Sequence, residues 1–135
     1  MNKTVNHLKN YRPLYFAIGF TLVFVLYISL VLVPFSSCYR LYVGSNSLGL
    51  SFYYTKDMVK SFFELRNLDQ LICYSEFLKI WDIIFAAVYT TMYASWIALL
   101  LKNKHLYLII PILAMICDWS ENYLEILIIM TEIEW

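Results

Sequence analysis

The sequence predicts an all-α integral membrane helical bundle. Three transmembrane helices and a short outer amphipathic helix would form a single membrane domain over residues 1–135. Apolar residues make up 61% of the chain and charged residues 15%, whereas soluble domains contain roughly 25% charged residues. The apolar residues occur in long blocks rather than in alternation, and the chain has only three glycines and three prolines. This composition excludes a linker-rich or low-complexity protein and favours helices in a lipid bilayer.

Three segments are long and apolar enough to be predicted as membrane spans. The first covers residues 14–33, inside a block from Pro13 to Tyr39 that contains no charged side chain. Twenty residues at a rise of about 1.5 Å cover about 30 Å, the thickness of the hydrocarbon core of a bilayer. The second span is predicted at 80–101 and the third at 106–130. Three carboxylates interrupt the third span: Asp118, Glu121 and Glu125.

The outer loop, residues 34–79, is long enough to require structure of its own. Apolar residues at helical spacing predict a helix at about 56–66, with Thr55 as its N-cap. Asn67 is expected to end this helix, and Asp69 to cap the next one. The helix would lie on the outer membrane surface and lead into the second span. Alternatively, it forms a lid over the end of the bundle.

The positions of Lys and Arg predict the orientation. Three of these residues lie in the N-terminal tail, and two lie in the short turn at 102–105. Because cytoplasmic ends and short loops are enriched in Lys and Arg, the N-terminus is expected in the cytoplasm and the loop 34–79 outside. The expected location is a bacterial inner (plasma) membrane. Cys38 and Cys73 both lie in the outer loop and either form a disulfide there or are two unrelated thiols.

Polar side chains form a stripe along one side of the third predicted span. Asp118, Glu121 and Glu125 fall within an arc of about 100° around the helix. A charge that faces lipid costs at least a few kcal/mol, so the stripe is expected to face the bundle or a partner. The second span is an antiparallel neighbour, and equal depth would place Tyr89 opposite Asp118, and Asp82 opposite Glu125. The candidate site residues on the two spans are Asp82, Tyr89, Tyr93, Asp118, Glu121, Asn122 and Glu125.

Three functions are compatible with these stripes. The spans contain no Lys or Arg, so at least one of Asp118 and Glu121 is expected to be protonated. The first hypothesis is therefore a buried site that binds a proton, a cation or a polar lipid-like ligand. The second is a non-enzymatic assembly subunit whose stripe docks a further helix. The third is an enzyme that uses the carboxylates as acid and base.

No cofactor and no metal site are expected. His7 and His105 lie outside the spans, and the chain has no glycine-rich phosphate loop. Ten Lys and Arg balance ten Asp and Glu, so there is no basic excess that would bind nucleic acid. The expected partners are the lipid bilayer and either a second copy of the chain or a membrane protein that supplies a fourth helix. Asn122, Glu125 and Glu132 would stand beside that open position.

Eight residues between Tyr74 and Asn122 form two spaced blocks. The patterns are Y-x7-D-x2-F-x3-Y and P-x6-D-x2-E-N, formed by Tyr74, Asp82, Phe85 and Tyr89, then by Pro111, Asp118, Glu121 and Asn122. Over about residues 54–130 the chain thereby resembles a family of small uncharacterised multi-pass bacterial membrane proteins that usually have four helices. Ala86 replaces a usual proline, and Leu71 and Ile72 replace a usual Gly-Arg pair. The resemblance implies a four-helix membrane architecture and no particular activity. The missing fourth helix would then mean a shorter variant, a fragment, or a protein that a partner completes.

Overall fold

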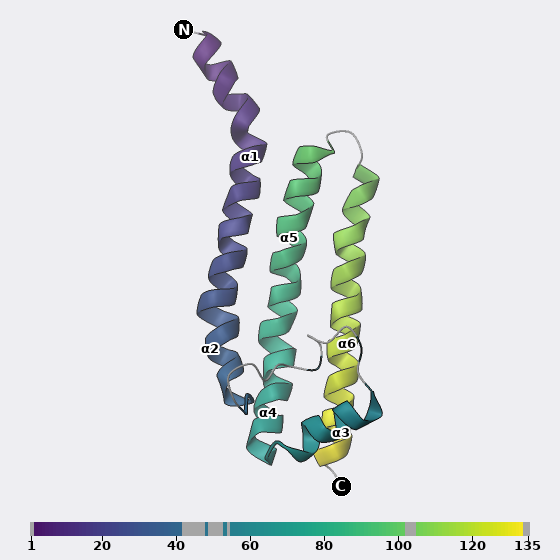
Figure 1. Ribbon diagram of the computed structural model, residues 1–135. Helices are drawn as coiled ribbons and strands as arrows, with labels where there is room; N and C mark the ends of the chain where they lie inside the picture. Colours follow the sequence, from purple (N-terminus) through teal and green to yellow (C-terminus); the bar gives the residue numbers. More distant parts are fainter. Residues whose placement is uncertain (1, 42–47, 49–52, 54, 102–104, 134–135) are drawn as a thin grey trace.

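The computed structural model describes residues 2–41, 48, 53, 55–101 and 105–133, with only the backbone described for 2–11 and 132–133. Every secondary-structure element in these ranges is helical, which confirms the all-α class. Within the same ranges the chain forms three long helices and one short helix, α3 (Lys56–Glu64), which lies across one end of the bundle (Figure 1).

The first long helix runs from Asn2 to Cys38 and contains the predicted span 14–33. It consists of α1 (Asn2–Tyr27), the π-helical turn η1 (Ile28–Leu32), α2 (Val33–Phe35) and the 3-10 turn η2 (Ser36–Cys38). The wide turn η1 ends two residues before Pro34. Proline has no N–H donor and its ring crowds the carbonyl four residues earlier, so the helix widens where that carbonyl lies.

The second long helix begins well before the position that the sequence predicted. It consists of α4 (Leu68–Phe77), the π-helical turn η4 (Leu78–Asp82) and α5 (Ile83–Leu100). The predicted start near Ile80 is wrong because a capping box starts the helix at Leu68. Asn67 accepts a hydrogen bond from the backbone of Gln70 at 2.8 Å, and the Gln70 side chain accepts one from Asn67 at 3.1 Å. Asn67 therefore begins this helix instead of ending the previous one, and Asp69 lies in the first turn rather than at the cap.

The third long helix closely matches its prediction at 106–130. It consists of the 3-10 turn η5 (His105–Leu108) and α6 (Ile109–Ile133). In Figure 1, α5 lies between α1 and α6, and it packs against both. The N-terminal part of α1 projects beyond the bundle at the end opposite to α3.

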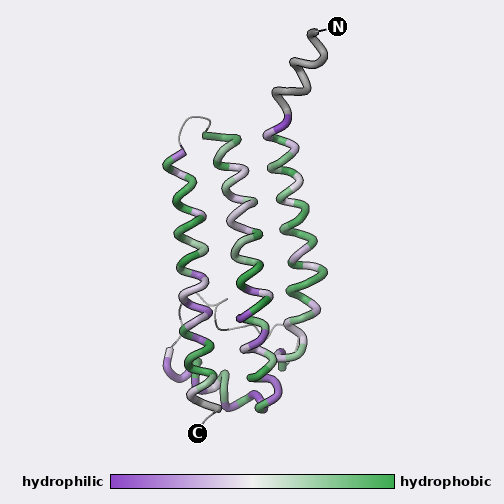
Figure 2. The backbone as a smooth tube through the Cα atoms, turned by 180° about the vertical axis from the view of Figure 1, so that it is seen from behind, coloured by the Kyte–Doolittle hydropathy of each residue, from purple (hydrophilic) through white to green (hydrophobic). Residues whose placement is uncertain are grey.

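Two of the helices in the described ranges are long and apolar enough to cross a membrane. They are residues Arg12–Cys38 and Leu68–Leu100. The helix α6 has a similar length and carries carboxylates at its middle. Figure 2 shows long hydrophobic stretches along all three helices, with hydrophilic residues concentrated near the end where α3 lies.

The short helix α3 was predicted at 56–66, and its start is confirmed. Thr55 is its N-cap and accepts a hydrogen bond from the backbone of Met58 at 3.3 Å. Phe62 is buried, with its ring centroid 5.1 Å from that of Tyr74. Lys60 points outward and pairs with Glu64 at 3.5 Å. These contacts agree with the lid interpretation, because the apolar side of α3 covers the end of the bundle.

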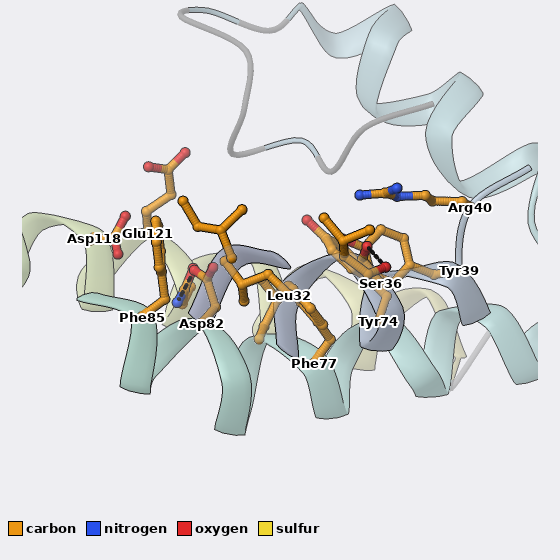
Figure 3. Close-up of a pocket in the computed structure, with 14 residues that line it drawn as sticks. Leu32, Ser36, Tyr39, Arg40, Tyr74, Phe77, Asp82, Phe85, Asp118 and Glu121 are labelled. Atoms are coloured by element: carbon orange, nitrogen blue, oxygen red, sulfur yellow. Dashed lines mark hydrogen bonds between the residues drawn. The ribbon is translucent and has the colours of Figure 1, made fainter. Parts of the chain in front are cut away.

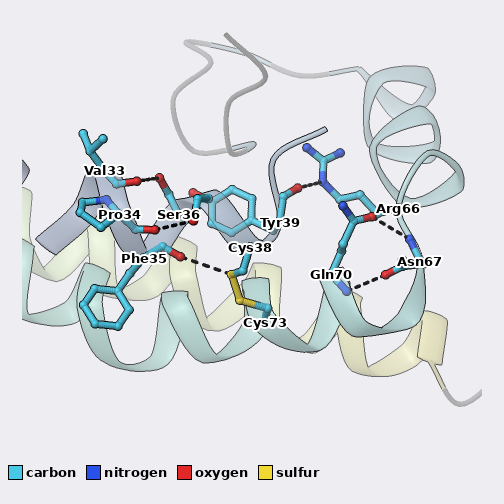
Figure 4. The surroundings of a disulfide bond; sticks show 11 residues. Val33, Pro34, Phe35, Ser36, Cys38, Tyr39, Arg66, Asn67, Gln70 and Cys73 are labelled. Atoms are coloured by element: carbon cyan, nitrogen blue, oxygen red, sulfur yellow. Dashed lines mark hydrogen bonds between the residues drawn. A yellow bond between two sulfur atoms is a disulfide. The ribbon is translucent and has the colours of Figure 1, made fainter. Parts of the chain in front are cut away.

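A disulfide and a buried arginine hold this end together. Cys38 and Cys73 are bonded, with their Cα atoms 6.3 Å apart, so the disulfide alternative is confirmed (Figure 4). Arg66 donates from Nε to the carbonyl of Tyr39 at 2.9 Å and from Nη1 to the carbonyl of Phe62 at 3.0 Å. Its guanidinium also lies 3.6 Å from the centroid of the Phe62 ring. The end of the first helix, the lid and the start of the second helix therefore form one packed unit.

The three long helices also meet around the wide turn η4. The Tyr27 hydroxyl donates to the backbone carbonyl of Trp81 at 2.8 Å, and the Trp119 indole N–H donates to the carbonyl of Ile83 at 3.3 Å. The first and third helices thus each bond to backbone acceptors in or next to this turn. The turn η1 of the first helix lies beside η4.

Candidate functional site

The polar stripe of α6 faces the interior of the bundle. Asn122 and Glu125 are buried, at 5% and 3% exposure, and Asp118 and Glu121 are half-buried. The remaining polar candidates come from the second helix, where Asp82 and Tyr89 are half-buried and Tyr93 is exposed. The expectation that Asn122 and Glu125 stand beside an open position is wrong, because the second helix covers both. Glu132 lies among the residues whose side chains are not described.

Glu125 meets Tyr74, which sequence reasoning did not include in the site. The Tyr74 hydroxyl donates to Glu125 Oε2, and the same hydroxyl accepts from the backbone N–H of Leu48 at 3.3 Å. Tyr74 is fully buried. Glu125 Oε1 is also buried and has no hydrogen-bond partner among the described residues. Tyr74 was missed because the loop 34–79 was not expected to contain the start of the second helix.

Asp82 meets Asn122, so its predicted position opposite Glu125 is wrong. The Asn122 Nδ2 atom donates to Asp82 Oδ2 at 2.8 Å. Nearer the turn between the helices, the Thr90 hydroxyl donates to the carbonyl of Pro111 at 3.2 Å. The partner of Asp82 is three residues earlier than predicted, which corresponds to about one helical turn. The prediction assumed a symmetrical turn between two regular α-helices and did not include η4.

Tyr89 belongs to an aromatic row rather than to a pair with Asp118. Its ring centroid lies 5.5 Å from that of Phe85 and 6.2 Å from that of Tyr93. Phe85 in turn stacks on Phe24 of the first helix, at 5.7 Å. Asp118 Oδ2 is buried and accepts no hydrogen bond from any part of the chain that the structure describes. Tyr89, which was predicted opposite Asp118, therefore forms no hydrogen bond with this oxygen.

A cavity of about 270 Å³ brings three of the candidate carboxylates together (Figure 3). Asp82 comes from the second helix, and Asp118 and Glu121 come from α6. Apolar side chains, including Leu32 and Phe85, form much of the wall. Asn122 also lines the cavity, whereas Glu125, Tyr89 and Tyr93 do not. The cavity is thus a partly apolar pocket with an acidic region.

The opposite region of the same cavity carries a residue that sequence reasoning missed. Arg40 lines the pocket at the end near Ser36, Tyr39 and Tyr74, away from Asp118 in Figure 3. It follows the last residue of the first helix, Cys38, by two positions. In the sequence Arg40 was one of several cations in a long loop, and nothing in the local pattern indicated that it lines the same cavity as carboxylates of the second and third helices.

Both π-helical turns line this cavity. Ile28 and Leu32 come from η1, and Leu78 and Asp82 come from η4. Wide turns of this kind inside α-helices occur frequently at functional sites. Two of them facing one pocket mark this level of the bundle as the candidate site.

The acidic groups are not arranged as a metal centre. Among the described residues, no group of three or more His, Cys, Asp or Glu side chains is placed to hold a metal ion. The walls next to the carboxylates are carbon-rich instead. This environment suits an organic cation or a proton.

No protein-family model matches this chain, and no curated protein and no solved structure matches it either. The resemblance to small multi-pass bacterial membrane proteins therefore stays a prediction, and so does the homodimer.

The Asp82–Asn122 hydrogen bond predicts a coupled effect on stability. The substitutions Asp82→Ala and Asn122→Ala should each lower the free energy of unfolding in detergent by about 1 kcal/mol. The double variant should lose less than the sum, because both changes remove the same interaction. The pair Tyr89→Phe and Asp118→Asn serves as the control and should be additive. Additive losses for Asp82 and Asn122 would contradict the register of the two helices.

Proposed function

We propose that the chain is a multi-pass membrane protein with three spans. Large apolar side chains point outward on all three long helices, for example Phe16 at 65%, Ile84 at 43% and Leu124 at 59% exposure. Such continuous apolar surface is typical of contact with lipid. The third helix turns its acidic side chains toward the second helix and its apolar side chains outward, which suits a span that carries buried polar groups.

We also propose that the end with α3 lies outside the cytoplasm. The disulfide between Cys38 and Cys73 supports this orientation, because such bonds form and persist in oxidising compartments. The N-terminal part of α1, the C-terminal end of α5 and the start of the third helix lie at the opposite end of the bundle, and in the sequence Lys and Arg residues cluster before Pro13 and between Leu101 and His105. Two independent properties of the chain thus favour the same orientation, which is compatible with a bacterial inner membrane.

Reporter fusions test this orientation. A phosphatase that is active only outside the cytoplasm should give a strong signal when fused after Ile133 and a background signal when fused after Leu101. A reporter that is active only in the cytoplasm should give the reverse pattern and serves as the control for expression. Phosphatase activity at Leu101 but not at Ile133 would overturn the orientation.

The pocket is proposed to bind an organic cation that carries an apolar body. The observation that supports this function is Asp118 Oδ2, a buried carboxylate oxygen on the cavity wall without a hydrogen-bond partner among the described residues. Glu121 and Asp82 line the same cavity, and no Lys or Arg forms an ion pair with any of the three in the described chain. A buried carboxylate requires a proton or a cation, and an ammonium group supplies both charge and donors. The apolar wall would hold the body of the ligand.

Binding of hexylamine tests this function. The chain in lipid nanodiscs should bind hexylamine in calorimetric titrations, with empty nanodiscs as the blank for partition into lipid. Asp118→Asn and Glu121→Gln should each weaken the binding about tenfold or more, because a charge-assisted hydrogen bond contributes about 1.5–3 kcal/mol. Glu76→Gln removes an exposed carboxylate on the second helix outside the pocket and should leave the affinity unchanged. Absence of binding, or equal losses in all three variants, would refute the proposal.

A further inference from the structure

The pocket carries opposite charges at its two ends. Asp118 and Glu121 lie at one end of the residues drawn in Figure 3, and Arg40 lies at the other. Arg40 is half-buried, and its guanidinium forms no ion pair with a carboxylate of the described chain. Leu32 and Phe77 lie on the wall between the two ends. The two sets of charges therefore face one cavity without neutralising each other by contact.

This arrangement is complementary to a molecule with two charges of its own. An interaction between separated charges is stronger beside apolar walls than in water. A ligand with an ammonium group only would satisfy Asp118 and Glu121 and leave Arg40 without a counter-ion. A ligand with a carboxylate only would leave the acidic end unpaired. A molecule with both groups at its two ends satisfies both regions at once.

We propose that the pocket binds a small elongated zwitterion, with its ammonium group at Asp118 and Glu121 and its carboxylate or phosphate at Arg40. This inference rests on the proposed function and adds the second charge of the ligand. A cavity of about 270 Å³ corresponds to a small molecule, near the lower end of the range of roughly 300–1,000 Å³ for ligand pockets.

The order of the charges favours a water-soluble zwitterion over a phospholipid. Arg40 lies at the end of the bundle that α3 covers, and the carboxylates lie further along the helices toward the other end. In an ethanolamine phospholipid the phosphate is joined to the glycerol, so it lies deeper in the membrane than the ammonium group. The pocket presents the opposite order, with the site for the anion at the end of the bundle.

Three matched probes test the proposal on the full chain in nanodiscs. They are hexylamine, hexanoate and aminohexanoate, each tested together with its longer homologues. Aminohexanoate carries both an ammonium group and a carboxylate. At one chain length the amino acid should bind at least about tenfold more tightly than its amine, and the carboxylate alone should not bind measurably. Arg40→Gln should remove this tenfold ratio between the affinities for the amino acid and for the amine. Lys79→Gln, which removes an exposed cation of the second helix outside this cavity, is the control and should change neither affinity.

The outcomes separate this inference from the proposed function. If the amines bind and no amino acid binds more tightly, the zwitterion is refuted and the cation site stands. If no probe binds, both are refuted. If Arg40→Gln weakens the amines as much as the amino acids, Arg40 only maintains the shape of the pocket and the proposal is wrong. Loss of aminohexanoate binding when phosphatidylethanolamine is added to phosphatidylglycerol nanodiscs would assign the site to a lipid and overturn the water-soluble ligand.

Discussion

Replacement of Tyr74 by alanine should lower the free energy of unfolding by about 3–5 kcal/mol, the range for removal of a large aromatic side chain from a core. Tyr74 is fully buried and its ring contacts Tyr39 and Phe62, with centroid separations of 4.7 Å and 5.1 Å. Its hydroxyl is also the hydrogen-bond donor to Glu125 Oε2. The variant would therefore lose packing and leave a buried carboxyl group without its donor.

A second variant separates these two contributions. Tyr74→Phe keeps the ring and removes only the hydroxyl, and it should lower the free energy of unfolding by about 1–3 kcal/mol. Tyr123→Ala removes an exposed tyrosine of α6, at 62% exposure, and should have a small effect. Denaturant titrations in detergent, followed by circular dichroism, measure all three variants. A loss below about 1 kcal/mol for Tyr74→Ala would contradict the core at the α3 end.

Loss of the Cys38–Cys73 disulfide should lower the free energy of unfolding by up to about 4 kcal/mol. The bond joins residues 35 positions apart. A cross-link that closes a loop of that length lowers the conformational entropy of the unfolded chain, and this entropy change corresponds to the estimate. Cys38→Ser with Cys73→Ser, or a reductant added to the unmodified chain, should lower the thermal midpoint in detergent. The bond also holds η2 against α4, so the effect should include looser packing at this end of the bundle.

Cys117 provides the control for this prediction. It is the exposed free cysteine of the described chain, so Cys117→Ser should leave the midpoint unchanged. The unreduced chain should react with one equivalent of a maleimide, and the reduced and denatured chain with three, one for each cysteine in the sequence. Three reactive thiols before reduction, or a midpoint that does not respond to reductant, would contradict the disulfide.

The helices were predictable from the sequence where local signals and long apolar blocks coincide. Thr55 correctly predicted the start of α3, because threonine directly before apolar residues at helical spacing is a favoured N-cap. The apolar blocks gave the positions of the first and third helices. The start of the second helix was not predictable by the same means, since Asn67 suits both the end of one helix and the cap of the next.

The partners of the site residues were less predictable, because they depend on the register between helices. The stripe of Asp118, Glu121 and Asn122 was found from helical spacing alone, and it does face the bundle. The predicted register between this stripe and the second helix was wrong by about one helical turn. A displacement of that size changes the partner of every side chain between the two helices. Arg40 comes from a segment with no repeating pattern, so only the folded chain places it in the same cavity as carboxylates that are far away in the sequence.

The wide turn η4 has a consequence for how substitutions act on this protein. Two side chains of the neighbouring helices bond to main-chain oxygen atoms, that of Trp81 in the turn and that of Ile83 next to it, and a main-chain oxygen is present whichever amino acid occupies the position. These two attachments of the outer helices are therefore specified by the donors, Tyr27 and Trp119. Substitutions at positions 81 and 83 should leave these two hydrogen bonds in place, because only the main-chain oxygens accept them. Substitutions of Tyr27 or Trp119 should remove them, because these side chains carry the donors.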